Sequence, residues 1–515
     1  MPFKIDQHER FGEGINRTMA TNNPEYPRGA CWDLLNMVYD RTSEDPEKMG
    51  GYTRLGSTDV GGAVSGLFDY DEGTRLISTD IGGKIYEYAG SDWAQSTNGT
   101  GFNTANTTRW SGTMFYGATT SANLLLLCNG IDAPQKYTSG AGVSALGGSP
   151  PSTGQFPVSF AGRLWMAAGS TLFYSAADNC EDWATLGGSF QIDRGTGDIT
   201  GLYNFMGNLL IFKKRKILRL LPGTSLASTS VRDVVSRIGS PSHWSVQESG
   251  EKNGSALYFM SNTGIQSLTA TAATGGFIVK NTADGIKRIL DSRLKTSLRT
   301  SWATFNEDRG EYWLQYPITD QDADAGVIGN TARRGTTPRW TRHDLRGKTA
   351  GSLFLSSNEE IQVIGDDGGR IYQMHSGDSR GVTGAAGFQG KVETAAYTQG
   401  DRGRMKRYGR IFVDLSTAGD YEVIVRQVLG RAELPNKAGN TLTPSGFGSL
   451  DGWGTGKWGE AVWGGSTVAG RWVRPTKVHR GSYSRLIVET TGPNEWFKMN
   501  GLALEYAMRR RILAA

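Results

Sequence analysis

The chain has 515 residues, which is more than one ordinary globular core and indicates several domains or one repeat architecture. Its 10% aromatic content and net charge of only +5 exclude a disordered chain, and so mild a charge does not by itself predict nucleic-acid binding. The 71 glycines, against 16 prolines, are typical of an all-β protein with many tight turns, because glycine supplies the positive φ angles that such turns need.

The N-terminus, MPFKIDQHERFGEG, contains no apolar stretch of the kind that a signal peptide needs. The longest aliphatic run, Leu124–Leu127, is far too short to span a membrane. The cysteines Cys31, Cys128 and Cys180 are odd in number and far apart, so they predict neither a disulfide framework nor a zinc site. We therefore expect synthesis in a reducing cytoplasm and no stable membrane insertion.

A repeated unit of short strands extends from about residue 60 to residue 375. Each unit has an apolar strand, a turn with Gly or Asn, a second strand such as LLLLC or NLLIF, and often a third strand that ends in an aromatic residue. The units are 46, 46, 43, 45 and 58 residues apart and begin at Val64, Trp110, Phe156, Ile199, Trp244 and Trp302. This period predicts a β-propeller of about six to seven blades, whereas two β-sandwiches would not need so regular a period.

Two turns in this region have nearly the same sequence, Asp80–Tyr86 and Asp366–Tyr372. Each contains Gly-Gly before a strand, which favours a two-residue hairpin turn. Between residues 270 and 300 the pattern changes, and Ile286, Ile289, Leu290 and Leu294 fall at helical spacing. A short helical insert is therefore expected there.

From about residue 376 a glycine-rich linker leads into longer alternating runs at 391–398, 410–415, 421–429, 484–490 and 496–509. Such alternation predicts half-buried strands. We divide the chain into residues 1–60, an N-terminal arm that leads into the propeller; residues 61–375, the β-propeller; and residues 376–515, a C-terminal, sandwich-like β domain with a Trp/Gly-rich insertion.

That insertion, residues 452–465, reads GWGTGKWGEAVWGG. Trp453, Trp458 and Trp463 recur every five residues, so they share no helical face and would alternate between the faces of one strand. They could form an aromatic shelf for a ligand, pack within the domain, or contact another chain. Because no active site emerges around them, a ligand shelf is disfavoured. We predict that one or two of the indoles anchor the loop on the C-terminal domain and that the remainder form a subunit contact, for which tryptophan is a favoured residue.

Two basic clusters stand out. Lys213, Lys214, Arg215 and Lys216 separate the apolar strands LLIF and ILRLL, and a second cluster contains Arg402, Arg404, Lys406 and Arg407. A charged turn is most often only solvated. The functional interpretation is a surface that faces a DNA lumen or an acidic partner, since attraction to phosphates requires only point charges.

No catalytic constellation can be assembled from the sequence. Residues 377–381, GDSRG, match the G-x-S-x-G pattern, but the glycine-rich sequence that follows will not form the required helix. The five histidines lie far apart, which argues against a zinc hydrolase, and the complete Asp-box of sialidases does not occur. We therefore expect no enzyme, no catalytic residues, no cofactor and no metal site.

The order of these features resembles the tail nozzle, or tail hub, proteins of short-tailed bacteriophages (podoviruses). The resemblance begins with Gly14 to Asn16, Pro27 to Gly29, Asp33 to Asn36 and Arg54 to Gly56. It continues through CEDWATLGGSFQIDRGTGDITGLYNFMGNLLIFKKRKILRLLPG and GSPSHWSVQESGEKNGSALYFMSNTGIQSL, and it covers most of the chain.

The resemblance implies a structural virion protein that forms a ring, usually of six copies, below the portal and adaptor. Such a ring extends and closes the channel for DNA ejection. The implied partners are further copies of the chain (a hexamer), the head-to-tail adaptor, a tail fibre, spike or tail-tip needle, and the passing genomic DNA. The implied location is the virion tail, after synthesis in the bacterial cytoplasm. The alternative is a receptor-binding or glycan-cleaving β-propeller protein of a phage tail.

Overall fold

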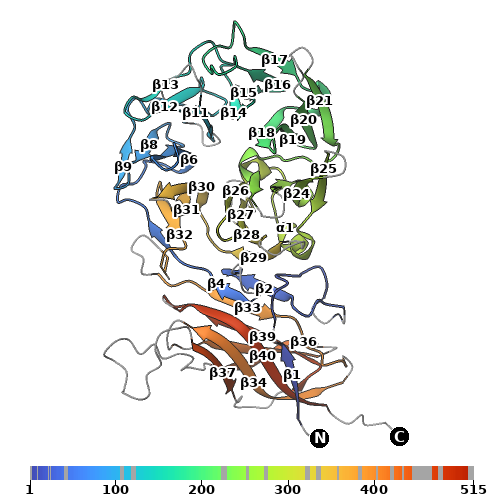
Figure 1. Cartoon of the computed structure of the whole chain (residues 1–515). Helices are drawn as coiled ribbons and strands as arrows, with labels where there is room; N and C mark the ends of the chain where they lie inside the picture. The colour runs from blue at the N-terminus through green and yellow to red at the C-terminus, as the bar shows by residue number, and fades with distance from the viewer. Residues whose placement is uncertain are drawn as a thin grey trace.

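The structure is a computed structural model. It describes residues 3–8, 10–20, 23, 25–39, 45–104, 109–116, 123–221, 229–250, 255–271, 276–318, 325–331, 338–356, 359–377, 379–380, 386–401, 404–417, 421, 423–431, 434–442, 467–473, 480–493 and 495–508. In Figure 1 these residues form a ring of small sheets, which stands on a second β domain that contains both chain ends. None of the helices among these residues is long and apolar enough to cross a bilayer.

The ring is a β-propeller, and the described residues provide seven blades of four antiparallel strands each (Figure 1). The first strands of most successive blades contact one another, so these strands surround the central axis. The blades are, in order, β6 (Val64–Tyr70), β7 (Arg75–Asp80), β8 (Ile85–Tyr88) and β9 (Trp93–Gln95); β10 (Ser111–Phe115), β11 (Leu124–Cys128), β12 (Gln135–Thr138) and β13 (Gly142–Ala145); β14 (Gln155–Phe160), β15 (Arg163–Ala168), β16 (Thr171–Tyr174) and β17 (Gly188–Gln191); β18 (Ile199–Phe205), β19 (Asn208–Lys213), β20 (Lys216–Leu221) and β21 (Ser230–Val235); β22 (Gln247–Ser249), β23 (Ala256–Ser261), β24 (Gly264–Ala270) and β25 (Phe277–Asn281); β26 (Trp302–Asn306), β27 (Glu311–Tyr316), β28 (Ala325–Asn330) and β29 (Arg339–His343); and β30 (Lys348–Ser356), β31 (Glu359–Asp366), β32 (Ile371–Met374) and β5 (Tyr52–Arg54).

The predicted propeller is confirmed. The first strands of the first six blades begin within three residues of the predicted unit starts. The blades are small sheets whose apolar faces pack against the neighbouring blade; for example, Ile77 of the first blade shares a core cluster with Leu125 and Tyr137 of the second. This packing explains the period of the sequence, because each repeat buries its apolar side chains only when the next repeat is present.

The last blade is completed by β5, a strand from the N-terminal segment, so the ring is closed by residues far apart in sequence. Immediately after β5, the chain is attached to the first blade. The indole nitrogen of Trp93 donates a hydrogen bond to the carbonyl oxygen of Leu55 over 2.8 Å. The carboxylate of Asp92 accepts hydrogen bonds from the backbone and hydroxyl groups of Ser57 and Thr58, and these bonds, that of the Ser57 hydroxyl first, lower the pKa of Asp92.

Replacing Trp93 by Phe tests this closure. The buried ring would keep most of its apolar contacts, but the Leu55 carbonyl would lose its donor, and we expect the free energy of unfolding to fall by about 1 kcal/mol. Urea denaturation followed by circular dichroism measures the change. Trp472→Phe is the matched control, since the Trp472 side chain is 39% exposed. An equal loss in both variants would contradict a role of the Trp93 hydrogen bond.

The two Gly-Gly turns form β-hairpins, as predicted, but they are longer than the predicted two-residue turn. Four residues separate β7 from β8, and four separate β31 from β32. Only the second glycine of each pair, Gly83 and Gly369, has a positive φ, 72° and 77°. The first residue of each turn explains the difference, because the carboxylates of Asp80 and Asp366 accept hydrogen bonds from backbone N–H groups within the loop and stabilise the longer form.

The helical insert is present but short. It consists of α1 (Lys287–Leu290), flanked by 3₁₀ turns at Asp284–Ile286 and Leu298–Thr300. Ile286 and Leu290 are buried in the core, as their spacing predicted. All three cysteines are free and buried, and burial raises their pKa values.

The second domain contains two packed sheets. One continues from the sixth blade through β2 (Cys31–Leu35), β33 (Gly390–Thr394), β39 (Tyr483–Thr490), β35 (Ile424–Arg431) and β36 (Leu434–Leu442). The other contains β1 (Lys4–His8), β3 (Met37–Tyr39), β4 (Pro46–Lys48), β34 (Lys406–Thr417), β37 (Thr467–Val473), β38 (Arg480–Gly481) and β40 (Phe497–Met508). The segment expected as an N-terminal arm is thus built into both domains: β1 to β4 belong to this sandwich, and β5 belongs to the propeller.

Propeller and sandwich share one core and one sheet. The largest hydrophobic cluster includes Tyr312 and Trp340 of the sixth blade as well as Val488 and Leu502 of the sandwich. Strand β2 pairs with β29 on one side and with β33 on the other, so the backbone ladder crosses from one domain into the next. The two domains therefore form one continuous body.

A buried carboxylate lies at this junction. Asp33 of β2 is 1% exposed and receives Arg342 of the sixth blade at 2.5 Å and 2.6 Å. It also pairs with Arg17 at 2.7 Å and with Lys391 of β33 at 2.6 Å. Burial alone would raise the pKa of Asp33, but the hydrogen bonds and charge of Arg342, together with Lys391 and Arg17, outweigh it and lower the pKa to about 2.

Candidate functional site

The first predicted basic cluster lies at the hairpin between β19 and β20. Lys213 does not reach the surface: its side chain is fully buried, and its ammonium group donates to the carbonyl oxygens of Ile192, Asp193 and Gly197 at 2.7–2.8 Å. Burial lowers the pKa of Lys213, and the nearby carboxylates of Asp193 and Asp198 offset this in part. The prediction that Lys213 faces a lumen or a partner is therefore wrong, because three backbone carbonyls hold its charge inside the blade.

Lys216 is also engaged within the chain. It pairs with Asp193 at 2.9 Å and with Asp233 at 3.0 Å, and these hydrogen bonds raise its pKa. Lys214 and Arg215, at the tip of the turn, are exposed. Lys214 and Arg215 form no ion pair with a carboxylate of the described residues. Of the four predicted residues, these two can therefore contact a partner.

A basic groove adjoins this turn. It encloses about 810 Å³ and is lined by Gly195, Thr196, Lys214, Arg215, Lys216, Ser236, Arg237, Asn262 and Thr263. Arg237 is exposed beside Lys214 and Arg215, and no carboxylate is among the described residues that line the groove. This surface is suited to a polyanion, because Lys214, Arg215 and Arg237 are exposed on it, while the neighbouring carboxylates of Asp193 and Asp233 are paired with Lys216.

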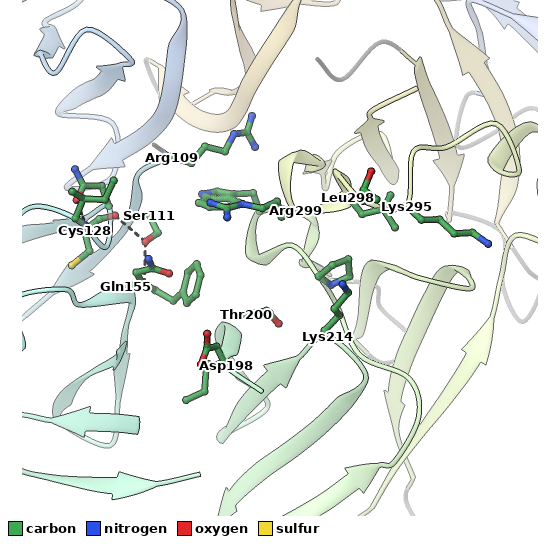
Figure 2. Close-up of a pocket in the computed structure, with 17 residues that line it drawn as sticks. Arg109, Ser111, Cys128, Gln155, Asp198, Thr200, Lys214, Lys295, Leu298 and Arg299 are labelled. Carbon is green, nitrogen blue, oxygen red and sulfur yellow. Dashed lines mark hydrogen bonds between the residues drawn. The ribbon is translucent and has the colours of Figure 1, made fainter. Parts of the chain in front are cut away.

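A smaller cavity of about 390 Å³ lies where the innermost strands of the second, third and fourth blades begin; we call it the axial cavity (Figure 2). Its charged lining residues are Arg109, Lys214, Lys295, Arg299 and Asp198. The remaining lining residues are Ser111, Cys128, Asn129, Ile131, Gln155, Phe156, Ile199, Thr200, Pro241, Trp244, Thr296 and Leu298. Lys214 belongs to both the groove and the axial cavity, so the two hollows form one basic region.

Arg109 and Trp244 line the axial cavity and also a second cavity, of about 390 Å³, between the innermost strands. The Arg109 guanidinium lies 5.3 Å from the centroid of the Trp244 indole, whose nitrogen donates to the Trp110 carbonyl over 2.7 Å. Burial lowers the pKa of Arg109 to about 10 and that of the adjacent His243 to about 4. At neutral pH the second cavity is therefore lined by a charged Arg109 and a neutral His243.

The side chains of the second predicted basic cluster also differ in whether they are exposed or engaged within the chain. Arg402 lies outside the described residues. Arg404 pairs with Asp401 at 3.1 Å, and Arg407 is exposed with its guanidinium 5.9 Å from the ring of Phe3. Lys406 is buried and donates to the carbonyl oxygens of Asp401, Arg404 and Ser482, so the prediction that it faces a lumen or a partner is wrong for the same reason as for Lys213.

Trp453, Trp458 and Trp463 lie outside the described residues, between β36 and β37, and their predicted role in a subunit contact stays a prediction. Among the residues that the structure does describe, no group of three His, Cys, Asp or Glu side chains is placed to hold a metal ion.

The sequence analysis missed the residues that the axial cavity adds, above all Arg109, Lys295 and Arg299. Each is an isolated basic residue without a motif, and Arg109 is nearly two hundred residues away from Lys295 and Arg299 along the chain. Trp244, Phe156 and Ile199 carried a signal, as the starts of repeat units. The blade register could have placed Arg109 and Trp244 at the same end of the propeller axis, because both precede a first strand.

No protein-family model and no curated protein sequence matches the chain. Among solved structures, the chain is similar to the crystal structure of the Myceliophteria thermophila Cps50 (Swd1) β-propeller domain, with 9% identity, coverage of 64% of this chain and 99% of that chain, and a TM-score of 0.40. It is also similar to the computationally designed Ika8 protein, with 10% identity, coverage of 63% and 99%, and a TM-score of 0.36. These likenesses concern the fold alone.

Proposed function

We propose that this chain is a structural subunit of the tail nozzle, or tail hub, of a short-tailed bacteriophage. Six copies would form a ring below the portal and adaptor, and the ring would extend and close the channel through which DNA leaves the capsid. The observation that carries the proposal is the junction between the two domains, where a continuous sheet, a common core and the Asp33 ion cluster join propeller and sandwich.

A ring around a DNA channel must keep its shape under internal pressure. Two domains that share a core and a sheet cannot hinge without breaking buried contacts, in contrast to domains joined by a small polar interface. Repeated around an axis, one such body can form head-to-tail contacts that close into a ring. The continuous junction therefore supports a structural role for the chain.

The basic groove supports contact with a polyanion. Lys214, Arg215 and Arg237 are exposed on one surface of the propeller, while the other two lysines of the predicted cluster are engaged internally. Three exposed cations give an attraction to phosphates that is weak and strongly dependent on salt, which suits DNA that must slide past. The same surface would equally suit an acidic face of a neighbouring subunit.

The oligomeric state of the purified chain, alone and with the adaptor of the same phage, tests the proposal. We expect six-fold rings in negative-stain images and a mass of six subunits by mass photometry. A stable monomer in the presence of the adaptor would contradict the ring, and hydrolysis of a host-surface glycan would favour the alternative, a glycan-cleaving propeller.

The double variant Lys214→Glu/Arg215→Glu tests the groove. We expect unchanged secondary structure and thermal stability, because both side chains are exposed, and at least about a tenfold loss of infectious particles, because reversed charges repel phosphates or an acidic neighbour. Lys287→Glu/Arg288→Glu, on the exposed side of α1, is the matched control. Equal infectivity of the two variants would exclude a role of the groove.

A further inference from the structure

We propose that the axial cavity binds a sugar-sized organic anion: a hydroxylated ring that carries one carboxylate or phosphate group. This proposal does not depend on the role of the chain in a phage tail, since it concerns a ligand that a single copy would bind.

The charge of the cavity is the first observation. Four cationic side chains and one carboxylate line it, and none of the four cations forms an ion pair with a carboxylate of the described chain. In Figure 2, Lys295 extends away from the other labelled cations, so Arg109, Arg299 and Lys214 are the ones nearest to a ligand. Lys214, Lys295 and Arg299 are exposed and Arg109 is half-buried, so solvent screens the charge of Arg109 least and its attraction to an anion is the strongest.

Arg109 is the cation best placed to fix an anionic group. Its guanidinium lies over the Trp244 indole, which is held by the hydrogen bond to Trp110, so little rotational freedom remains to be lost on binding. Burial disfavours its charged form, as its lowered pKa indicates, and no described carboxylate compensates. An anionic oxygen at this position would supply the missing counter-charge, and the planar guanidinium can hold a carboxylate or phosphate with two hydrogen bonds.

The side of the cavity formed by the beginnings of β10, β14 and β18 has different chemistry. The hydroxyl groups of Ser111 and Thr200 are occupied, since they donate to the carbonyl oxygens of Cys128 and Ser240. The carboxylate of Asp198 and the amide of Gln155 are not in the described hydrogen bonds and remain to bind a ligand. A carboxylate accepts hydrogen bonds from hydroxyl groups and repels a second negative charge, so this side selects a ligand with hydroxyl groups and one anionic group.

The size of the cavity limits the size of the ligand. A volume of about 390 Å³ is at the small end of ligand sites in proteins, and it admits one hydroxylated ring rather than a folded macromolecule. A DNA duplex is too wide to enter and would reach only the exposed rim residues Lys214 and Arg299. The apolar contacts offered by Trp244, Phe156 and Leu298 suit the carbon faces of such a ring.

Titration calorimetry of the full-length protein at low salt tests the proposal, with glucuronate, glucose 6-phosphate and glucose as probes. We expect at least one of the two anions to bind about tenfold or more tightly than glucose, because a charge-assisted hydrogen bond distinguishes them. Tighter binding of glucuronate would point to an acidic sugar of a polysaccharide, and tighter binding of glucose 6-phosphate would point to a sugar phosphate. Equal binding of all three, or none, would overturn the proposal.

Variants locate the site. Arg109→Gln and Arg299→Gln should each weaken binding of the preferred anion by about tenfold, and Asp198→Asn should weaken it less while allowing a second negative group on the ligand. Arg299 is exposed, so its variant should fold even if that of Arg109 does not, and Arg288→Gln on α1 is the matched control. Unchanged binding in Arg299→Gln and Arg109→Gln would overturn the proposal. A 20-base-pair duplex that binds where the sugars do not would also overturn it and assign the region to nucleic acid.

Discussion

Asp33→Asn is expected to lower the free energy of unfolding by about 3–5 kcal/mol. The substitution removes the negative charge that Arg342, Arg17 and Lys391 share, at a position that is 1% exposed. The three cations then lie close together with Asp33 no longer charged, although Lys391 keeps Glu393 at 3.4 Å. Urea denaturation followed by tryptophan fluorescence measures the loss. Because the cations come from the sixth blade, the N-terminal segment and β33, we also expect faster proteolysis between propeller and sandwich.

The pH dependence of this variant provides a second measurement. Asp33 has a pKa of about 2 in the folded chain, against about 3.9 in an unfolded one. Its contribution to the free energy of unfolding is therefore complete above about pH 4 and is lost as the pH falls through about 2. The difference in stability between wild type and Asp33→Asn should therefore be constant from pH 7 to about pH 4.5 and shrink below that. The other carboxylates titrate in both the wild type and the variant, so the difference in stability between these two proteins reports on Asp33.

Asp291→Asn is the control for both measurements. Asp291 is 60% exposed, and its nearest cation, Arg293, lies 3.9 Å away, so its removal should change stability by well under 1 kcal/mol. If Asp33→Asn were as stable as this control at pH 7, the ion cluster would not hold the two domains together, and the support that it gives to a rigid ring subunit would disappear.

The blades could be predicted from the sequence because their signal is local. Each hairpin is encoded by an apolar run, a turn and a second apolar run, and the packing between blades repeats that pattern every 43 to 58 residues. The sandwich strands of the C-terminal part were predicted for the same reason, since β34, β39 and β40 alternate strictly enough to be recognised without their partners.

The N-terminal strands could not be placed in this way. Strands β3, β4 and β5 have three residues each, which is too short for any period. Strand β3 pairs with β4, but β4 also pairs with β40 and β5 pairs with β32, and these partners lie more than three hundred residues further along the chain. Their pairing is decided by which sheet edges remain open once the rest has folded. Sequence alone suggested an arm because a segment without periodicity is read as irregular, although its residues close the propeller and build the junction.

The axial cavity was hidden for a related reason. Arg109, Asp198 and Arg299 belong to no sequence motif. Only the closure of the propeller brings these three segments of the chain together. Conversely, the run of four basic residues at 213–216 attracted attention by its composition, although composition does not distinguish a lysine that points out of a hairpin from one that points into the blade. Alternation along β19 places Lys213 on the same face as Ile211, which packs against the third blade, and both faces of this strand are buried.

Lys213→Met should therefore act as a folding variant and not as a surface variant. The methionine can fill the space of the lysine stem, but the carbonyl oxygens of Ile192, Asp193 and Gly197 would lose their donor inside the protein, and we expect the free energy of unfolding to fall by about 2–4 kcal/mol. Thermal and urea unfolding measure the loss. The segment 192–197, which these bonds attach to β19, should show the largest increase in hydrogen exchange.

Lys214→Met is the matched control, because it removes the same charge from the next residue, whose side chain is exposed. We expect it to leave stability unchanged and to weaken only the salt-dependent binding of polyanions to the groove. If both variants destabilised the protein equally, Lys213 would owe its effect to the charge of the turn as a whole. If Lys213→Met alone unfolds more easily, a charge reversal of all four residues would combine a folding defect with a binding defect, and Lys214 and Arg215 alone can report on a partner.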